Sequence, residues 1–154
     1  MLETNRRRRT RPAVKNVLFA MAVGVVIAAC GGGAATPASP TPTTFAMAVQ
    51  NGSGVSGTGD IVKGNGSFTL TIKLTGMPAN SIHISHIHAG ACARPGGIVY
   101  NLQSVAADSA GAATTRSNVP DPYLVPASGW YVNVHFGPDF TETAYAPSIS
   151  CGDL

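Results

Sequence analysis

The 154-residue sequence is poor in charged and aromatic residues. Charged residues make up 11% of the chain and aromatic residues 6%, whereas glycine and proline together occupy 29 positions. A helical bundle needs abundant Glu, Lys and Leu, so this composition excludes an all-α fold and favours short strands joined by many turns. The length suffices for one domain with a hydrophobic core and excludes a multidomain enzyme.

Basic residues are scarce outside the N-terminal segment. Six of the ten basic residues lie in residues 1–15, and the chain after Ala29 carries four basic and six acidic residues, a formal charge of −2. A nucleic-acid-binding surface is a basic patch, so we expect no nucleic-acid partner for the folded part.

The N-terminal segment has the layout of an export signal. A basic cluster is followed by a thirteen-residue apolar run, residues 17–29, and then by Cys30. A membrane-spanning helix needs about 20 apolar residues, so the run fits the short apolar region of a signal peptide better. Residues 27–30, Ile-Ala-Ala-Cys, resemble the bacterial lipobox, in which the cysteine is lipidated and becomes the first residue of the mature protein.

This resemblance implies a lipoprotein signal peptide over residues 1–29 and an exported chain held at the bacterial cell membrane or envelope through lipid on Cys30. The alternatives are cleavage near Ala29 without lipid and an uncleaved anchor. Residues 31–44, GGGAATPASPTPTT, offer no side chains for a core. We therefore expect residues 30–44 to be a lipidated cysteine with a flexible linker, and residues 45–154 to be the folded domain.

The expected domain reads as consecutive strands. Residues 67–76 alternate strictly between apolar and polar side chains, as a half-buried strand does. Asn51-Gly52 and Asn65-Gly66 are dipeptides that type I′ hairpin turns favour. Eight strands are predicted, at residues 45–50, 54–63, 67–76, 82–88, 98–106, 112–119, 131–136 and 148–152. The pattern predicts an all-β fold, a Greek-key β-sandwich or flattened barrel of antiparallel strands.

All four histidines of the chain lie in two of these predicted strands. His86 and His88 project from the same face of a strand, about 6.6 Å apart, which two imidazoles can close over one metal ion. His83 is out of phase with this pair, and we expect it to be a supporting or structural group. Ile82 and Ile84 lie on one face of a regular strand and Ile87 lies on the other. Because Ile87 is expected to face inward, this conflict predicts a bulge near Ser85.

The second strand carries His135. Its apolar face is expected to consist of Trp130, Val132, Val134 and Phe136. Tyr131, Asn133 and His135 then point the other way, which leaves His135 outside the core. If the two strands are neighbours, three imidazoles converge in a set that suits copper or zinc. The alternative is that these histidines bond to one another on a polar sheet face without metal.

These motifs resemble a known family. The spacing of His83, His86 and His88, a cysteine soon afterwards, a distant Asn-Val-His and a terminal Cys-Gly resemble the skeleton of Cu/Zn superoxide dismutase. Closer still is the similarity to small exported bacterial proteins with the CHRD domain, whose marks are His-Ile-His-x-Gly (residues 86–90) and Tyr-Val-Asn-Val-His (residues 131–135). The resemblance covers residues 45–154 and implies a superoxide dismutase-like β-sandwich.

Position by position, the resemblance implies copper ligation by His86, His88 and His135, support from His83, and a Cys92–Cys151 disulfide. These are also the two cysteines left if Cys30 is lipidated, an even count in an oxidising compartment.

The departures from the dismutase concern its zinc site and its substrate. No histidine lies between His88 and His135, so the bridging histidine and the zinc subsite are missing. Ser148 stands where the dismutase has a substrate-steering arginine, and Arg94 and Arg116 are expected to be surface charges.

The leading hypothesis is a lipid-anchored CHRD-type domain that binds copper, with zinc as the alternative metal, without efficient catalysis. A copper-only superoxide dismutase and a metal-free interaction module are the competing hypotheses. A three-histidine zinc hydrolase is disfavoured because no acidic residue lies close in sequence to act as base.

Overall fold

The structure is a computed structural model in which residues 39–154 are described. The expected signal peptide, residues 1–29, and the expected lipidation site, Cys30, lie outside the described residues, as does most of the expected linker. The first strand begins at Thr43, so the last two residues assigned to the linker belong to the sheet. Within residues 39–154, the search for a helix long and apolar enough to cross a membrane found none.

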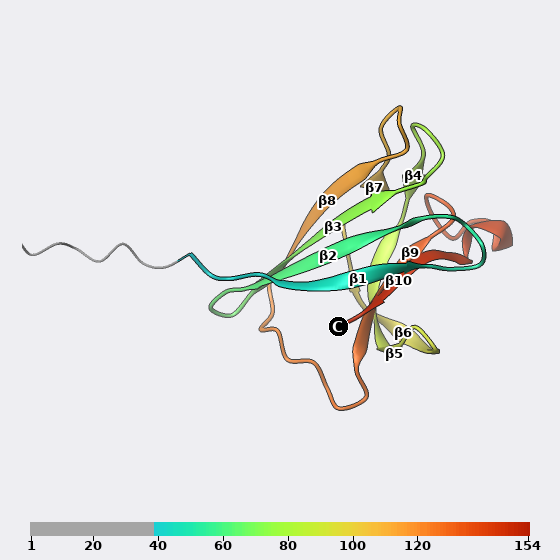
Figure 1. The fold of residues 1–154 in the computed structure, drawn as a ribbon. Helices are drawn as coiled ribbons and strands as arrows, with labels where there is room; N and C mark the ends of the chain where they lie inside the picture. Colours follow the sequence, from blue (N-terminus) through green and yellow to red (C-terminus); the bar gives the residue numbers. More distant parts are fainter. Residues whose placement is uncertain (1–38) are drawn as a thin grey trace, which may run out of the picture. The chain divides into compact units, whose positions relative to one another are not determined.

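The described chain is nearly all β, as predicted from the sequence. It contains ten strands and one short 3-10 helix, η1 (Figure 1). Their bounds are β1 Thr43–Val49, β2 Ser56–Lys63, β3 Phe68–Thr75, β4 Ile82–His83, β5 Ser85–Ala91, β6 Arg94–Asn101, β7 Val105–Ala106, β8 Ala113–Val119, β9 Trp130–His135, η1 Thr143–Tyr145 and β10 Ser148–Asp153.

Eight of the strands form one curled antiparallel sheet in the order β6-β5-β9-β10-β1-β2-β3-β8, and β4 pairs separately with β7. Strand β1 joins the two halves of this sheet. Its residues 43–47 pair with β2, and Ala48 and Val49 pair with β10. Because β1 is shared, β2, β3 and β8 continue the sheet on one side of it, and β10, β9, β5 and β6 on the other (Figure 1).

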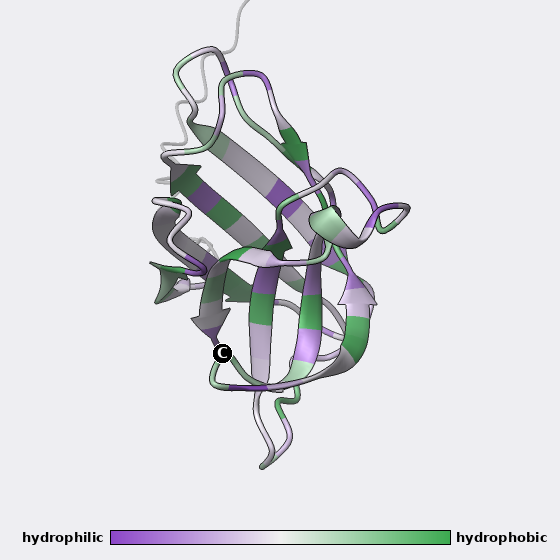
Figure 2. Cartoon of the chain, turned by 90° about the vertical axis from the view of Figure 1, so that its right-hand side faces the viewer, coloured by the Kyte–Doolittle hydropathy of each residue, from purple (hydrophilic) through white to green (hydrophobic). Residues whose placement is uncertain are grey.

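The core contains apolar side chains from both halves of the sheet. The apolar residues of β3, from Phe68 to Leu74, are at most 2% exposed, as their alternation predicts. They belong to one cluster with Ile87 of β5 and with Val132 and Val134 of β9. Bands of apolar and polar residues alternate along the strands in Figure 2. Each such side chain contributes about 1.5–3 kcal/mol of burial free energy.

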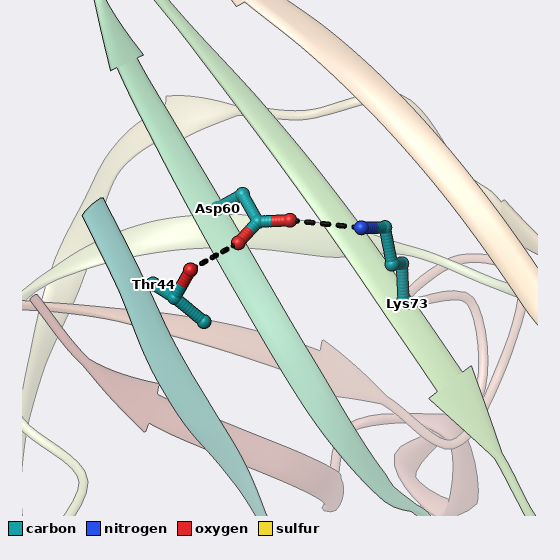
Figure 3. A network of polar contacts seen from close by, with 3 residues as sticks. All are labelled: Thr44, Asp60 and Lys73. Atoms are coloured by element: carbon teal, nitrogen blue, oxygen red, sulfur yellow. Dashed lines mark hydrogen bonds and ion pairs between the residues drawn. The ribbon is translucent and has the colours of Figure 1, made fainter. Parts of the chain in front are cut away.

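A polar network lies on the outer face of β1, β2 and β3. Asp60 of β2 accepts hydrogen bonds from Thr44 Oγ1 at 2.6 Å and from Lys73 Nζ at 2.9 Å, which link three adjacent strands (Figure 3). The bond from Thr44, and then the bond from Lys73, lower the pKa of the Asp60 carboxyl. Lys73 alternates with the buried residues of β3, so the period-two prediction for residues 67–76 holds on both faces of that strand.

Two of the eight predicted strands are interrupted, which raises the number to ten. The strand expected at residues 82–88 breaks at Ile84, where β4 pairs with β7 and β5 joins the large sheet. In place of the bulge expected near Ser85, the chain breaks between two strands that belong to different sheets. At the break, the Ile84 N–H donates to Gly137 O, and Ile84 O accepts from the His135 N–H, both at 3.0 Å. The strand expected at residues 98–106 breaks over residues 102–104.

The two predicted type I′ turns differ in outcome. Asn51 and Gly52 have φ of 50° and 68°, and the Ser53 N–H donates to Gln50 O at 3.0 Å, which fits the predicted turn. At Asn65-Gly66 the predicted hairpin of antiparallel strands forms between β2 and β3, but its turn is not type I′, because only Gly66 has a positive φ, 71°. There the bond from Gly64 N–H to Ser67 O closes a longer connection that needs one left-handed residue instead of two.

Candidate metal centre

Two neighbouring strands carry the histidines that the sequence singled out. Strands β5 and β9 pair antiparallel, with His86 opposite Asn133 and His88 opposite Tyr131. Ile87 lies between the two histidines and is fully buried in the core. Because side chains alternate along a strand, the histidines lie on the opposite face of this sheet.

His86, His88 and His135 form a compact three-histidine cluster. Their ligand nitrogens all lie within 4.8 Å of one another. The ring centroids are 5.7 Å apart for His86 and His88, 5.3 Å for His86 and His135, and 5.7 Å for His88 and His135. A metal–nitrogen bond of about 2.0–2.1 Å sets tetrahedral donors about 3.3 Å apart, so modest side-chain rotation closes the cluster on one ion.

His135 is more buried than the sequence suggested. It points away from the core of Val132 and Val134, as predicted, yet only 5% of its surface is exposed. The fourth apolar residue expected on the core face, Phe136, is half exposed because β9 ends at His135. The expectation for Phe136 is therefore wrong.

Backbone carbonyls orient two of the three imidazoles. His88 Nδ1 lies 3.0 Å from Gly96 O, and His135 Nδ1 lies 2.7 Å from Ala146 O. A carbonyl only accepts, so both Nδ1 atoms carry hydrogen, and the Nε2 lone pairs remain for a ligand when the rings are neutral. Such bonds from the second ring nitrogen are the usual support of a metal-bound histidine.

Two buried nitrogens of the cluster have no hydrogen-bond partner, His86 Nδ1 and His88 Nε2. An unpaired buried polar atom costs about 1–3 kcal/mol, so such an atom usually marks a site for an ion or a water, or a functional role. With these two atoms and His135 Nε2, the cluster offers three imidazole nitrogen donors. This set can hold a metal ion.

The environment favours the neutral form of His86 and of His135. Burial, and then the charges of His135 and His88, lower the pKa of His86 to about 4. Burial is also the main reason why the pKa of His135 is lowered, against a smaller opposing effect of the bond to Ala146. Neutral imidazole is the form that binds a metal.

Two aromatic rings enclose the cluster. Phe140 stacks on His86 at 5.5 Å between centroids and meets His135 edge-on at 4.8 Å. Tyr131 stacks on His88 at 5.1 Å. The sequence placed Tyr131 on this face through its phase, but no local pattern marked Phe140, which belongs to the connection after β9.

His83 stays outside the cluster, as its phase predicts. It is 2% exposed, its Nδ1 lies 3.0 Å from His135 O, and its Nε2 lies 2.8 Å from Ser81 Oγ. Both ring nitrogens are thus occupied, and the ring supports the end of β9 that carries His135. A cavity of about 290 Å³ beside it is lined mainly by apolar side chains such as Val55 and contains none of the cluster residues.

A disulfide joins Cys92 and Cys151, as predicted. It connects the β5–β6 turn, just beyond His88, to β10. The Cys92 N–H also donates to Asp153 Oδ1 at 2.7 Å. The hairpin after the two β5 histidines is therefore fixed to the last strand by a covalent and a polar link.

A polar chain leads from β10 to His135. Ser148 Oγ donates to Asn133 Oδ1, and Asn133 Nδ2 lies 3.2 Å from His135 Nε2. The alternation along residues 130–136 predicts Asn133 on this face, and Ser148 stands where the dismutase has an arginine. No local pattern indicates that these two side chains are in contact.

Comparison with models of known protein families found no match for this chain. Comparison with curated proteins found no match either.

Proposed function

We propose that this chain is an exported, lipid-anchored CHRD-type domain that binds one copper ion through His86, His88 and His135 without being an efficient enzyme. The observation that carries the metal-binding part is the buried cluster of three imidazoles, two of which have nitrogens without a partner. Mutual hydrogen bonding, the metal-free alternative for these histidines, leaves those nitrogens unexplained.

Copper is favoured over zinc by the donor set. All three donors are imidazole nitrogens, and for such sites the affinity of Cu(II) exceeds that of Zn(II). Three protein donors leave a further coordination position for water or a small ligand. The CHRD likeness supports the same choice, because its two motifs contain the three residues of the cluster.

We do not expect efficient superoxide turnover by this chain. The fourth histidine of the chain, His83, has both ring nitrogens engaged and cannot bridge to a second metal. Arg116 lies on β8, at the opposite end of the sheet order from β5 and β9. Arg94 lies on the exposed edge strand β6, and Ser148 donates to Asn133 where the dismutase has its steering arginine.

The proposal is tested by titrating the purified full chain with Cu(II) and Zn(II) against a competing chelator. We expect one Cu(II) per chain, bound more tightly than Zn(II), with nitrogen hyperfine coupling in the electron paramagnetic resonance spectrum. His135→Ala should weaken binding strongly and His83→Ala less, with circular dichroism as the check of folding. Equal binding by wild type and the triple variant H86A/H88A/H135A would end the metal hypothesis.

A superoxide assay on the copper-loaded chain separates the competing enzyme hypothesis. Weak or no turnover agrees with the proposal. Removal of superoxide near the diffusion limit would instead favour the copper-only dismutase.

A further inference from the structure

Asn133 occupies the position that a metal needs at His135. It lies two residues before His135 on β9, opposite His86 on β5, and is 7% exposed. Its Nδ2 lies 3.2 Å from His135 Nε2, the nitrogen left for a ligand once Nδ1 donates to Ala146. A neutral imidazole nitrogen has one lone pair, so it cannot serve this amide and a metal ion at the same time.

The direction of each bond in the chain is determined by its partners. Because Ala146 O only accepts, His135 Nδ1 carries the hydrogen, and Nε2 of the neutral ring must accept. Asn133 therefore presents its NH₂ group to Nε2 and its oxygen to Ser148, whose hydroxyl donates to that oxygen. The reversed amide would set an oxygen lone pair against the Nε2 lone pair.

A place for the amide to move lies beside it. A cavity of about 190 Å³ is lined by Tyr131, Asn133, Ser148 and both cysteines of the disulfide, and none of the three cluster histidines is among its lining residues. A water needs about 30 Å³, so the cavity can take the displaced amide together with solvent. Ser148, at the cavity wall, can keep its bond to the Asn133 oxygen while the NH₂ group turns away.

We propose that Asn133, held by Ser148, acts as an amide lock on the metal site. In the metal-free chain its NH₂ group donates to His135 Nε2, and the metal must displace this bond in order to bind. The pair therefore lowers the affinity for the metal and slows its uptake. This inference rests on the proposed metal binding. It assigns Asn133 as a positioning residue that tunes the site from outside the ligand set. A hydrogen bond contributes about 0.5–1.5 kcal/mol net, so its loss should change the affinity by about two- to tenfold.

The direction of the effect separates the lock from a merely structural role. If Asn133 chiefly held the His135 ring in place, Asn133→Ala would weaken metal binding. If it competes with the metal, Asn133→Ala tightens Cu(II) binding by about two- to tenfold and speeds uptake. Asn133→Asp, which cannot donate to Nε2 and adds an anionic oxygen, tightens it further. Ser148→Ala, which frees the amide, has a smaller effect in the same direction.

The experiment titrates the full chain and these variants with Cu(II) against a competing chelator and follows uptake by stopped flow. Ser150→Ala is the matched control, because Ser150, which is buried, lies on β10 like Ser148 but donates to Ala48 O. This variant should leave the affinity for Cu(II) and the rate of uptake unchanged. Unchanged or weaker binding by folded Asn133→Ala overturns the lock. If that variant fails to fold, the nearly isosteric and uncharged Asn133→Leu, which cannot donate to Nε2, decides by the same comparison.

A metal-free readout keeps this inference separate from the proposed function. In the apo chain, the ¹⁵N resonance of His135 Nε2 should lie upfield of its position in Asn133→Ala, because only the wild-type nitrogen accepts the hydrogen bond of the Asn133 amide. Identical resonances would overturn the lock even if copper binds. Absence of copper binding to wild type would instead refute the proposed function, and the hydrogen bond would then be only part of a metal-free polar network.

Discussion

At the scale of single residues, the cluster depends on which nitrogen of each imidazole carries its proton. His88 and His135 each present Nδ1 to a backbone carbonyl, of Gly96 and Ala146. The backbone therefore selects the tautomer and leaves Nε2 toward the cluster, which is how an outer hydrogen bond prepares a histidine ligand.

We predict that His88 and His135 are Nδ1–H tautomers in the metal-free chain above neutral pH. Because Nε2 is then the free donor, adding Zn(II) as a diamagnetic probe should move the Nε2 resonances of both rings most. Histidine ¹⁵N–¹³C correlation spectra of the labelled full chain measure both effects. A hydrogen on Nε2 of either ring would contradict the hydrogen-bond assignment.

The buried His86 predicts an acid-sensitive apo fold. Its pKa is about 4 in the folded chain against an ordinary value of 6.5, so the unfolded chain binds protons more readily between these values. The stability is therefore full above about pH 6.5 and falls as the pH drops toward 4. This one group should cost about 2 kcal/mol of unfolding free energy between pH 7 and pH 5.

Urea denaturation of the full chain with a chelator present measures this loss. The loss should be smaller in His86→Gln, whose side chain does not titrate. Equal pH dependence in wild type and variant would rule out His86 as the source.

At the scale of elements, the disulfide fixes the hairpin of β5 and β6 to β10. The linked residues, Cys92 and Cys151, are 59 positions apart. Closing a loop of this length removes chain entropy from the unfolded state worth about 4 kcal/mol on the loop-closure model. That is a large share of the 5–15 kcal/mol that typically stabilises a domain.

We predict that the double variant C92A/C151A loses about 4 kcal/mol of unfolding free energy. Its melting temperature should fall by many degrees, since each 1 kcal/mol shifts a domain of this size by about 4 °C or more. Thermal and urea unfolding with and without reductant test this. The reductant should destabilise wild type and leave the double variant unchanged. Equal unfolding midpoints for wild type and double variant without reductant would refute the prediction.

The strands were predictable because alternation is a local property of the sequence. The residues of β3 alternate within a single segment, so their burial follows without knowledge of any partner. The break at Ile84 was not marked in this way, because it depends on pairing of β4 with β7 and on bonds to Gly137 and His135. The sequence indicated an irregularity there but not a second sheet.

The candidate site shows the same division between local and distant information. The spacing of His86 and His88, and the phase of His135, are local, so these three candidate ligands were predictable. Their convergence depends on the pairing of β5 with β9, which the sequence left as a condition. The contact of Asn133 with Ser148 requires β9 and β10 to pair in register, and the cover by Phe140 requires the path of the long connection after β9. No short motif encodes either contact.

At the scale of the whole molecule, the proposed anchor and the proposed metal site lie in separate parts of the sequence. The three histidines of the cluster and the side chains that contact or support them lie between Ser81 and Asp153, within the described residues 39–154. The lipobox-like residues 27–30 and the Gly, Pro and Thr-rich stretch after them contribute none of these side chains. Attachment to a membrane and binding of copper should therefore be separable by mutation.

We predict that Cys30→Ser abolishes lipid attachment and gives unprocessed or released chain, because the thiol of this cysteine is the group that the lipobox resemblance assigns to lipid. Labelling of expressing bacteria with a traceable fatty acid, followed by membrane fractionation, measures this. Wild type should carry label and sediment with membranes, and the variant should carry none. The variant should still bind Cu(II) with wild-type affinity, since none of the three ligand histidines is altered. A wild-type chain without label would refute the anchor, whereas loss of copper binding in Cys30→Ser would show that the two parts of the molecule are coupled.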